Sequence, residues 1–428
     1  MIVNDIKGDL HSQTAGYRQK LGKVFVIDPQ GIGHQYDPFH GRMTEDKLYS
    51  SAKHLLFDPN DREAIFTQRA SKMLTQIFLA ARMENQTAGK ETHWLLPYVR
   101  QMVDLGLKGA AGRLQTISPE LAIRFLDGEF DPQKDYTENK FLTSAWETLT
   151  SRLFALLTED VIRCFAGSDF TAKELMTSDK PTTVYLRWPE QDLLALSPLV
   201  RLLWSSLIDS LITHYDANEG KDCNPVLLLV DEAGRTAIPM LADSATTVVG
   251  RRISLWLAVQ SLSQLESVYG RARAQVLRDN MDSQLFYRPT DIQTAKYLEE
   301  RIGNVSAYAR SQTLHRGDET SEGRSERPIP LLSSQDIVLM SDEQVIAFHR
   351  NYRPMRLTRC DWRKPPILAK RRRLPPRKLS PLPELDRRDK TLWQTTEKAF
   401  DGYIDPDQRH TALRPSQNPL KTVFEKHI

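Results

Sequence analysis

The sequence contains little cysteine and no long hydrophobic run. Its three cysteines, Cys164, Cys223 and Cys360, form no CxxC pair and have no paired histidines at a metal-ligand spacing. This pattern excludes a disulfide scaffold, argues against a structural zinc site and indicates a reducing, cytosolic compartment. No run of about 18 apolar residues is present, so the sequence predicts no helix that crosses a bilayer by itself. The opening residues, MIVNDIKGDLH, lack the basic and apolar regions of a secretory signal peptide.

The chain also lacks a strong overall charge, because its net charge is only +3 over 428 residues. Residues 363–428 carry 16 Lys and Arg against 8 Asp and Glu, whereas residues 1–362 carry 42 against 47. The mildly acidic body excludes a positive coat along the whole chain, so nucleic acid would have to bind through focal loops or an assembled channel. With 26% charged and 40% hydrophobic residues, a chain of this length is expected to form two or three domains.

Strand and helix patterns alternate at the start of the chain. Residues 1–5 (MIVND) and 23–28 (KVFVID) are short β-rich runs on either side of a helical pattern at residues 9–20. This order is typical of a βαβ unit in a parallel sheet. From about residue 62 to residue 170, apolar residues recur at helical spacing with few β-rich runs between them, which predicts an all-α insertion.

A second set of strand patterns follows the expected insertion. The strands are predicted at residues 182–188, 225–232, 253–260 and 283–287, with helical patterns between them. Because these strands are apolar throughout, their order predicts a parallel sheet covered by helices on both faces.

Three later segments differ in composition. The polar residues 308–327 predict a loop, and residues 345–362 predict a hairpin. After residue 362, repeated prolines and the run KRRRLPPRK predict a tail that forms no packed domain. This tail could contact nucleic acid or acidic lipid, or it could be a solvated disordered segment.

The motif LLLVDEAGR places two acids directly after a buried strand. Ligands of open α/β sheets bind at the carboxyl ends of the strands, where Asp231 can hold Mg²⁺ and Glu232 can polarise an attacking water. The next strand, ISLWLAVQ, ends in Gln260 at the same predicted edge, where an amide can sense a γ-phosphate. Each motif alone also fits a simpler structure: a solvated acidic turn for the first and a strand-to-helix cap for the second.

A phosphate-binding loop of the form GxxxxGK followed by Ser or Thr is missing from the sequence. In such a loop, backbone N–H groups surround the phosphates, and the Lys and hydroxyl side chains contact the phosphates and the metal ion. Gly89-Lys90 and Gly220-Lys221 are each followed by an acidic residue and have no glycine at the first position of the motif. The segment GIG at residues 31–33 lacks the third glycine of a dinucleotide-binding loop.

Three co-linear segments resemble the type IV secretion coupling proteins, which are the TraG/TraD-type ATPases of conjugative DNA transfer. The segments are LLLVDEAGRTAIPML, GRRISLWLAVQSLSQLESVYG and LRDNMDSQLFYRPTDIQTAKYLEERIG. The opening NDIKGDLHSQTAGYR and the later RPIPLLSSQDIVLMSDEQVIAFHRNYRPMR are similar to that family's second strand–helix unit and its closing strands. The resemblance covers roughly residues 1–362.

This resemblance implies an α/β fold with a RecA-like P-loop NTPase-type parallel sheet, an inserted all-α domain and assembly into a homo-hexamer. It implies ATP and Mg²⁺ as cofactors, with ATP hydrolysis moving single-stranded DNA and its bound relaxase to type IV secretion channel proteins. The expected location is the cytoplasmic face of a bacterial inner membrane. The alternatives are a catalytically inactive remnant or interaction subunit, and a soluble RecA-like DNA translocase.

The resemblance also implies roles for individual residues. Asp231 would be the metal-associated acid, Glu232 the catalytic base and Gln260 the phosphate sensor. Asp5 and Lys7 would lie near the nucleotide or a subunit interface. An arginine supplied by a neighbouring subunit is expected in such a ring, and the candidates are Arg251, Arg252, Arg271 and Arg273.

The expected division of the chain follows from the same resemblance. Residues 1–62 would be the incomplete first part of the RecA-like domain, 63–178 the inserted all-α domain and 179–362 the second part. Residues 363–428 would be a disordered, basic, proline-rich tail. Because the family's transmembrane helices and phosphate-binding loop precede the strand at residues 1–5, we expect an N-terminally truncated chain whose sheet is short of a central strand.

Overall fold

A six-stranded sheet lies at the centre of the part of the chain that the structure describes, which is residues 1–58, 61, 63–87, 95–235, 238, 240–314 and 320–384. In this computed structural model the strand order is β3-β2-β4-β1-β5-β6. The strands are β1 (Ile2–Asp5), β2 (Val24–Asp28), β3 (Ile32–Gly33), β4 (Thr183–Arg187), β5 (Val226–Val230) and β6 (Ile253–Leu257). Neighbouring strands are parallel except β2 and β3, which confirms the predicted parallel sheet.

The two central strands are buried on both faces. Every residue of β1 is buried, as is every residue of β4 before its last. Val3 and Tyr185 pack with Ala15 of α1 (Asp9–Leu21) on one face. Alternate residues of the same strands share the main core with α10 (Leu193–Ala217). Helices cover both faces of the sheet, which explains why these strands are apolar throughout and do not alternate with polar residues.

Helix α10 is apolar enough to resemble a membrane span. Among the described helices it alone passes that test by length and composition, with a mean hydropathy of 1.3 over its most apolar 18 residues. However, 67% of that stretch is buried inside the protein. This is the position of a core helix, so length and composition are weak evidence for a span here.

The described residues between β3 and β4 form helices and 3-10 turns and contain no strand, as the helical spacing predicted. The long helix α3 is central to this region, since Leu74, Ile77 and Phe78 are completely buried. Asn139 begins α7 by accepting the backbone N–H groups of the next turn. The helices are α2 (Glu45–Leu56), α3 (Ala64–Thr87), α4 (Leu95–Asp104), α5 (Gly106–Ile117), α6 (Pro119–Leu126), α7 (Lys140–Leu153), α8 (Glu159–Phe165) and α9 (Glu174–Thr177).

The strand at residues 283–287 does not continue the parallel sheet, so that part of the prediction was wrong. This strand, β7 (Ser283–Phe286), pairs antiparallel with β10 (Gln344–His349), which pairs with β11 (Met355–Thr358). The predicted hairpin at residues 345–362 is confirmed as β10 and β11. Helices α14 (Ile292–Ile302) and α15 (Ser334–Val338) contribute to the core on one face of this second sheet.

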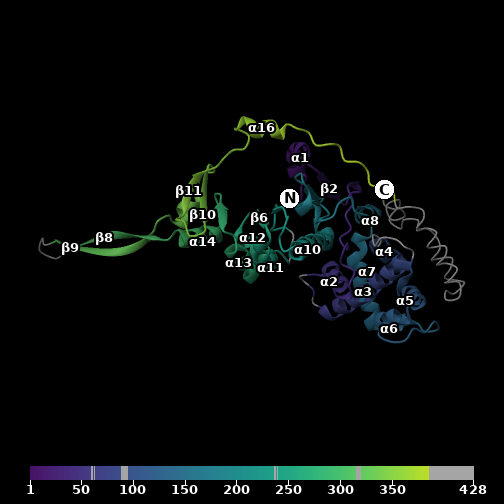
Figure 1. Ribbon diagram of the computed structural model, residues 1–428. Helices are drawn as coiled ribbons and strands as arrows, with labels where there is room; N and C mark the ends of the chain where they lie inside the picture. Colours follow the sequence, from purple (N-terminus) through teal and green to yellow (C-terminus); the bar gives the residue numbers. More distant parts are fainter. Residues whose placement is uncertain are drawn as a thin grey trace, which may run out of the picture.

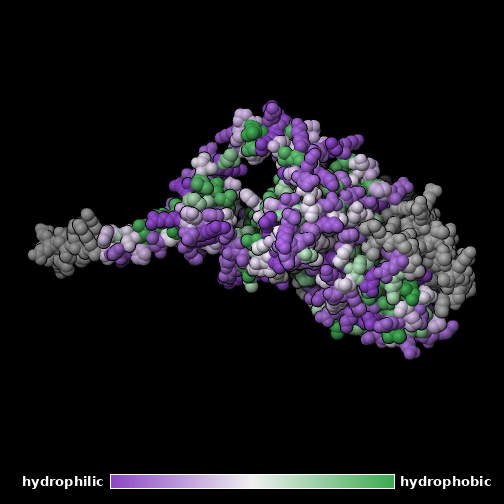
Figure 2. Space-filling model, in the orientation of Figure 1, coloured by the Kyte–Doolittle hydropathy of each residue, from purple (hydrophilic) through white to green (hydrophobic). Residues whose placement is uncertain are grey.

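The two sheets are separate because no strand joins them: β6 and β7 each have an edge with no strand beside it among the described residues. The two sheets are linked to each other, because the helices that follow β6 and β7 begin side by side. The Leu262 N–H of α12 (Leu262–Tyr269) donates to Thr294 Oγ1 of α14 at 3.3 Å. Apolar side chains are exposed on both edge strands, with Trp256 at 56% and Leu285 at 48%. The space-filling view shows further apolar atoms over β10 and β11 (Figure 2).

The segment predicted as a loop at residues 308–327 instead belongs to a long hairpin that projects from the body (Figure 1). Strands β8 (Asn304–Leu314) and β9 (Thr320–Pro330) pair continuously from Asn304↔Pro330 to Leu314↔Thr320. The prediction was wrong because it relied on apolar content. The described side chains of this hairpin, such as Tyr308 and Ile329, face solvent on both sides, so no alternation is needed.

Residues 363–384, here named the strap, are ordered, contrary to the expectation for the tail. The strap contains α16 (Pro366–Arg372) and then runs past α1 to the edge of the main sheet (Figure 1). There the Gly33 N–H donates to Ser380 O and the Leu382 N–H donates to Gly31 O, both at 2.8 Å. Prolines permit this packing because an extended chain can still bond to the free edge of β3. The rest of the predicted tail, from residue 385, lies outside the described residues.

The remaining elements complete the connections between the strands. They are α11 (Met240–Thr247), α13 (Arg271–Asp279) and a 3-10 turn (Val249–Arg251).

We expect Gly16→Ala to loosen the strap. A Cβ atom on Gly16 of α1 would overlap the carbonyl groups of Leu374 and Pro375, so α1 and the strap could not approach as closely. Alanine normally stabilises a helix relative to glycine, but here we expect a loss of about 1–3 kcal/mol in the free energy of unfolding. Thermal denaturation would measure this loss, and faster limited proteolysis within the strap would report the loosening. Gly128→Ala, where a Cβ meets nothing within 4 Å, is the control; equal behaviour of the two variants would contradict the contact.

Candidate active site

The carboxyl ends of β5 and β6 lie side by side. The ladder between them extends past both strands, since the Ala258 N–H donates to Val230 O at 3.0 Å and the Ala233 N–H donates to Ala258 O at 2.9 Å. Asp231 and Glu232 follow β5 directly, and Gln260 follows β6 three residues after Leu257. The three side chains therefore leave neighbouring parallel strands at one edge of the sheet.

Asp231 is the half-buried acid of this edge. Its Oδ1 accepts the Glu232 N–H at 3.1 Å, and its backbone carbonyl accepts the side-chain N–H of Asn4 at 3.3 Å. Burial raises the pKa of Asp231, and the neighbouring Glu232 charge adds to this, while Lys7 opposes it. A single carboxylate suits Mg²⁺, which proteins hold through one or two carboxylates together with waters and substrate phosphates.

Elsewhere, the described ranges contain no group of three or more His, Cys, Asp or Glu side chains arranged to hold a metal ion. A magnesium ion at this edge would accordingly take most of its ligands from nucleotide and water. Asp231 is the residue that fits it.

Glu232 is held between two cations. Its Oε1 lies 2.9 Å from Lys7 Nζ, and its Oε2 lies 3.3 Å from Arg235 Nη1. Arg235 also pairs with Glu190, which follows β4. The ion pair raises the pKa of Lys7 above its ordinary value. These three connected ion pairs therefore extend across the carboxyl ends of β1, β5 and β4.

The backbone of Glu232 is unusual, since its φ of +52° lies in the left-handed region. This conformation costs an L-residue roughly 1–2 kcal/mol. The Arg235 N–H donates to Glu232 O at 2.9 Å and closes the turn. Such conformations are concentrated at functional sites, which is consistent with a functional role for the Glu232 side chain.

Gln260 is exposed just before α12. Its N–H donates to Gln264 Oε1 at 3.4 Å, and Ser261 begins the helix by accepting the Gln264 N–H at 3.1 Å. Gln264 also contacts Gly234, where a Cβ atom would lie 2.5 Å from Gln264 Oε1. Gly234 thus allows the turns after β5 and β6 to approach one another closely.

The two residues expected from β1 have protein partners. Asp5 is 2% exposed, and its carboxylate accepts the N–H groups of Leu10 at 3.3 Å and His11 at 2.7 Å. It therefore orders the first turn of α1, and its burial raises its pKa. Lys7, in contrast, extends to Glu232.

Two of the candidate arginines lie at the opposite edge of the sheet. Arg251 and Arg252 immediately precede β6. Arg251 makes a two-point contact with Asp216, at 2.7 and 3.0 Å. Arg252 donates to Cys223 O at 2.9 Å. The structure therefore separates them from Glu232 within one chain.

The other two candidates, Arg271 and Arg273, are exposed on the first turn of α13. Sequence reasoning missed Arg235 and Glu190, although a usable signal existed. Both residues follow strands of the predicted parallel sheet, so the edge rule that selected Gln260 would have selected them too.

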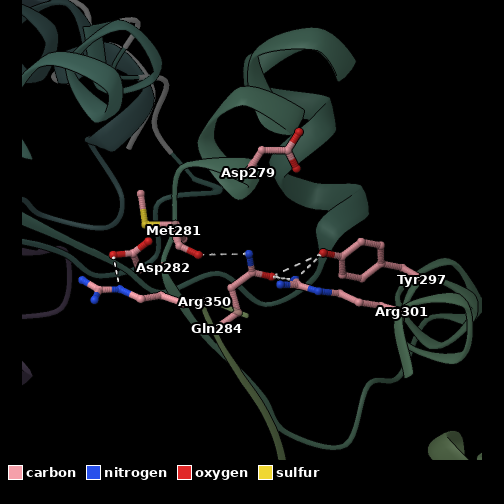
Figure 3. Close-up of a pocket in the computed structure, with 7 residues that line it drawn as sticks. All are labelled: Asp279, Met281, Asp282, Gln284, Tyr297, Arg301 and Arg350. Atoms are coloured by element: carbon pink, nitrogen blue, oxygen red, sulfur yellow. Dashed lines mark hydrogen bonds and ion pairs between the residues drawn. The ribbon is translucent and has the colours of Figure 1, made fainter. Parts of the chain in front are cut away.

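A separate polar cavity of about 330 Å³ lies at the second sheet (Figure 3). Its polar side chains are largely paired with one another: Arg301 Nη1 donates to Tyr297 Oη at 2.6 Å and also to Gln284, and Arg350 pairs with Asp282 at 3.1 Å. This pairing indicates a structural joint between α13, β7, α14 and β10. The lining residues are Asp279, Met281, Asp282, Gln284, Tyr297, Arg301 and Arg350.

We expect Glu232→Gly to be more stable than Glu232→Ala by about 1 kcal/mol, because only glycine adopts a positive φ without cost. Both variants lose the same ion pairs, so their difference isolates the backbone term. Chemical denaturation would measure it. The matched pair Glu266→Gly and Glu266→Ala, within α12, should show the opposite order. An alanine variant at 232 as stable as the glycine variant would contradict the backbone conformation.

Comparison with known proteins agrees with this geometry. A family model described as type IV secretory system conjugative DNA transfer matches residues 1–380. Protein VirD4 of Rhizobium radiobacter is 28% identical over 399 residues, which is 90% of this chain and 56% of the relative. The conjugal transfer protein TraG of Escherichia coli is 23% identical over 328 residues, which is 71% of this chain and 51% of the relative. The chain thus spans about half the length of these curated relatives.

Solved structures share the fold. The conjugative coupling protein TrwBΔN70, in a trigonal form with sulphate, superposes with a TM-score of 0.60 at 18% identity, over 84% of this chain and 78% of that chain. TrwB in complex with ADP and Mg²⁺ gives 0.57 at 17% identity, over 90% and 86%. The parallel sheet and the co-linear motifs thus have one explanation: the chain belongs to the type IV secretory system conjugative DNA-transfer family, the coupling proteins, and has their RecA-like α/β fold.

Proposed function

We propose that this chain is a nucleotide-dependent coupling protein that delivers relaxase-bound single-stranded DNA to a type IV secretion channel, working as a homo-hexamer at the cytoplasmic face of the inner membrane. The observation that carries the proposal is the placement of Asp231, Glu232 and Gln260 at one carboxyl edge of adjacent parallel strands. The sequence relatives VirD4 and TraG support the DNA-transfer role.

The chemistry follows from the residue types. Asp231 would hold Mg²⁺, whose charge neutralises phosphate oxygens. Glu232 would accept a proton from the attacking water, and the Gln260 amide would hydrogen-bond the terminal phosphate. Asp5 would act indirectly by ordering the β1–α1 loop that carries Lys7. An arginine from a neighbouring copy would complete the site, and Arg271 and Arg273 are exposed for this role.

These residues do not supply a phosphate-binding loop, since the sequence has no GxxxxGK motif. We propose that such a loop follows a further parallel strand that pairs with the free edge of β6, beside Gln260. Two observations support this position. The edges of β6 and β7 are both unpaired among the described residues, and both edge strands leave apolar side chains exposed. Such edges are normally paired or covered.

One observation favours a second candidate function, an interaction subunit that binds partners without hydrolysing ATP. The Glu232 carboxylate is engaged by Lys7 and Arg235 rather than directed at a substrate position. A soluble RecA-like DNA translocase is the third candidate, and the match of the family model over residues 1–380 favours the coupling role over it.

The test of the proposed function is ATP turnover with single-stranded DNA and Mg²⁺. We expect Glu232→Gln to lower kcat by about 10²- to 10⁴-fold, which is the usual contribution of a general base. Glu219→Gln, at an exposed acid far from the edge, should leave kcat unchanged. Equal turnover of Glu232→Gln and the unsubstituted protein would remove Glu232 from its role. No turnover in the unsubstituted protein, with ATP binding absent in equilibrium dialysis, would favour the interaction subunit.

The strap is the proposed DNA contact outside the site. Four consecutive basic residues, Lys370–Arg373, end α16. We expect the triple variant Lys370→Ala, Arg372→Ala, Arg373→Ala to lower the slope of log K against log salt for single-stranded DNA by about 0.7 per lost phosphate contact. Fluorescence anisotropy across a salt series would measure the slope.

A charge-matched control removes three exposed lysines elsewhere, through Lys180→Ala, Lys221→Ala and Lys296→Ala. The control should keep the original slope. An unchanged slope in the strap variant would assign the strap no role in DNA binding.

A further inference from the structure

Both oxygens of the Glu232 carboxylate accept a cationic donor, and those donors lie to one side. Lys7 follows β1, and Arg235 is tied to Glu190, which follows β4. In the strand order β4-β1-β5-β6, these residues flank β5 on the side away from β6. Gln260 follows β6 on the other side. The carboxylate is therefore turned away from the place where it and Gln260 could act together.

The two cations hold Glu232 differently. Arg235 is three residues from Glu232 in the same turn and is itself fixed by Glu190, so its contact is local. Lys7 comes from another strand and is the long-range contact. Its side chain is 47% exposed, whereas that of Glu232 is 17% exposed.

The Lys7 contact is suited to release. An exposed ion pair contributes little net stability, because water and salt screen it. An ammonium group on a flexible four-carbon chain can exchange one oxygen partner for another at small cost. Phosphate oxygens are strong acceptors for such a group, and Lys7 already lies at the edge where phosphates would arrive. A phosphate anion can therefore compete directly with Glu232.

We propose that Lys7 is a positioning residue that keeps Glu232 in a resting orientation, and that a phosphate anion at the carboxyl edge captures Lys7 Nζ and frees the carboxylate to turn toward β6 and Gln260. The phosphate comes either from a nucleotide or from the backbone of single-stranded DNA. This inference rests on the proposed function for what Glu232 does once released. The resting contact and its loss on phosphate binding stand without it.

A zero-length carbodiimide cross-link on the intact protein tests the contact. The reagent joins an amine and a carboxylate only when they touch, so Lys7 and Glu232, 2.9 Å apart, should yield a linked peptide pair by mass spectrometry. Lys23 and Glu174, 3.4 Å apart and away from this edge, form the internal control. Formation of the control link without the Lys7–Glu232 link would overturn the resting orientation.

Three probes then test release: Mg²⁺-ATP, an oligo-thymidylate and inorganic phosphate, each added separately. We expect the yield of the Lys7–Glu232 link to fall at least threefold with one of the first two, while the Lys23–Glu174 link is unchanged. A fall with Mg²⁺-ATP alone identifies the nucleotide as the source, and a fall with the oligonucleotide alone identifies the DNA backbone. A yield indifferent to all three probes would overturn the proposal. None of these measurements requires turnover, so failure of the proposed hydrolysis is a separate result.

Kinetic variants separate positioning from mere structure. In Lys7→Met the long-range contact is lost, so we expect basal turnover to rise several-fold. If the oligonucleotide is the phosphate source, stimulation by DNA should also shrink while KM for ATP stays nearly unchanged; if the nucleotide is the source, KM for ATP should rise. Lys7→Arg keeps a cation and should restore the original ratio of stimulated to basal turnover. Lys23→Met is the control for loss of a surface lysine. Unchanged basal turnover in Lys7→Met would contradict the role assigned to Lys7.

Discussion

The buried side chain of Asn4 is the interaction on which the geometry of the carboxyl edge depends. Its Oδ1 accepts the indole N–H groups of Trp188 at 3.1 Å and Trp204 at 3.3 Å, and its Nδ2 donates to Asp231 O at 3.3 Å. One amide thus joins β1, the end of β4, the core helix α10 and the end of β5. A buried donor left without a partner costs about 1–3 kcal/mol, so neither indole can move independently of Asn4. The Asn4 side chain thereby connects the backbone at Asp231 to the buried core.

The sheet that carries this contact has a covered half and a half with an open edge among the described residues. Around β1 and β4 the sheet is covered on both faces. In the described part of the chain no strand pairs with the outer edge of β6, where Trp256 is exposed, and β7 belongs to a second sheet. The catalytic candidates follow β5 and β6, at the boundary between the two halves. A strand that pairs with β6, as proposed above, would therefore lie beside Gln260.

Sequence reasoning predicted five of the six strands of the main sheet because apolar, β-rich runs are a local signal, and it missed only the two-residue β3. It predicted the partners of β7 wrongly because pairing with β10 is set by residues about sixty positions away, and no local pattern records it. The β8–β9 hairpin was missed because its described side chains face solvent on both sides. The ion pair between Lys7 and Glu232 could not be predicted from the sequence for another reason. It depends on the left-handed turn at Glu232, and a non-glycine residue gives no sequence signal for that conformation.

The ion pairs at the two edges of the sheet differ in geometry. At the amino edge, Arg251 pairs with Asp216 through two hydrogen bonds, at 2.7 and 3.0 Å, which adds geometric specificity to the ion pair. At the carboxyl edge, Lys7 reaches Glu232 through a single exposed contact. The strap packs on the helix that follows this contact, because Arg371 stacks on Tyr17 of α1 at 4.6 Å and the Arg377 N–H donates to Gln19. Since α1 begins two residues after Lys7, the strap connects the second sheet to the helix beside the Lys7–Glu232 pair.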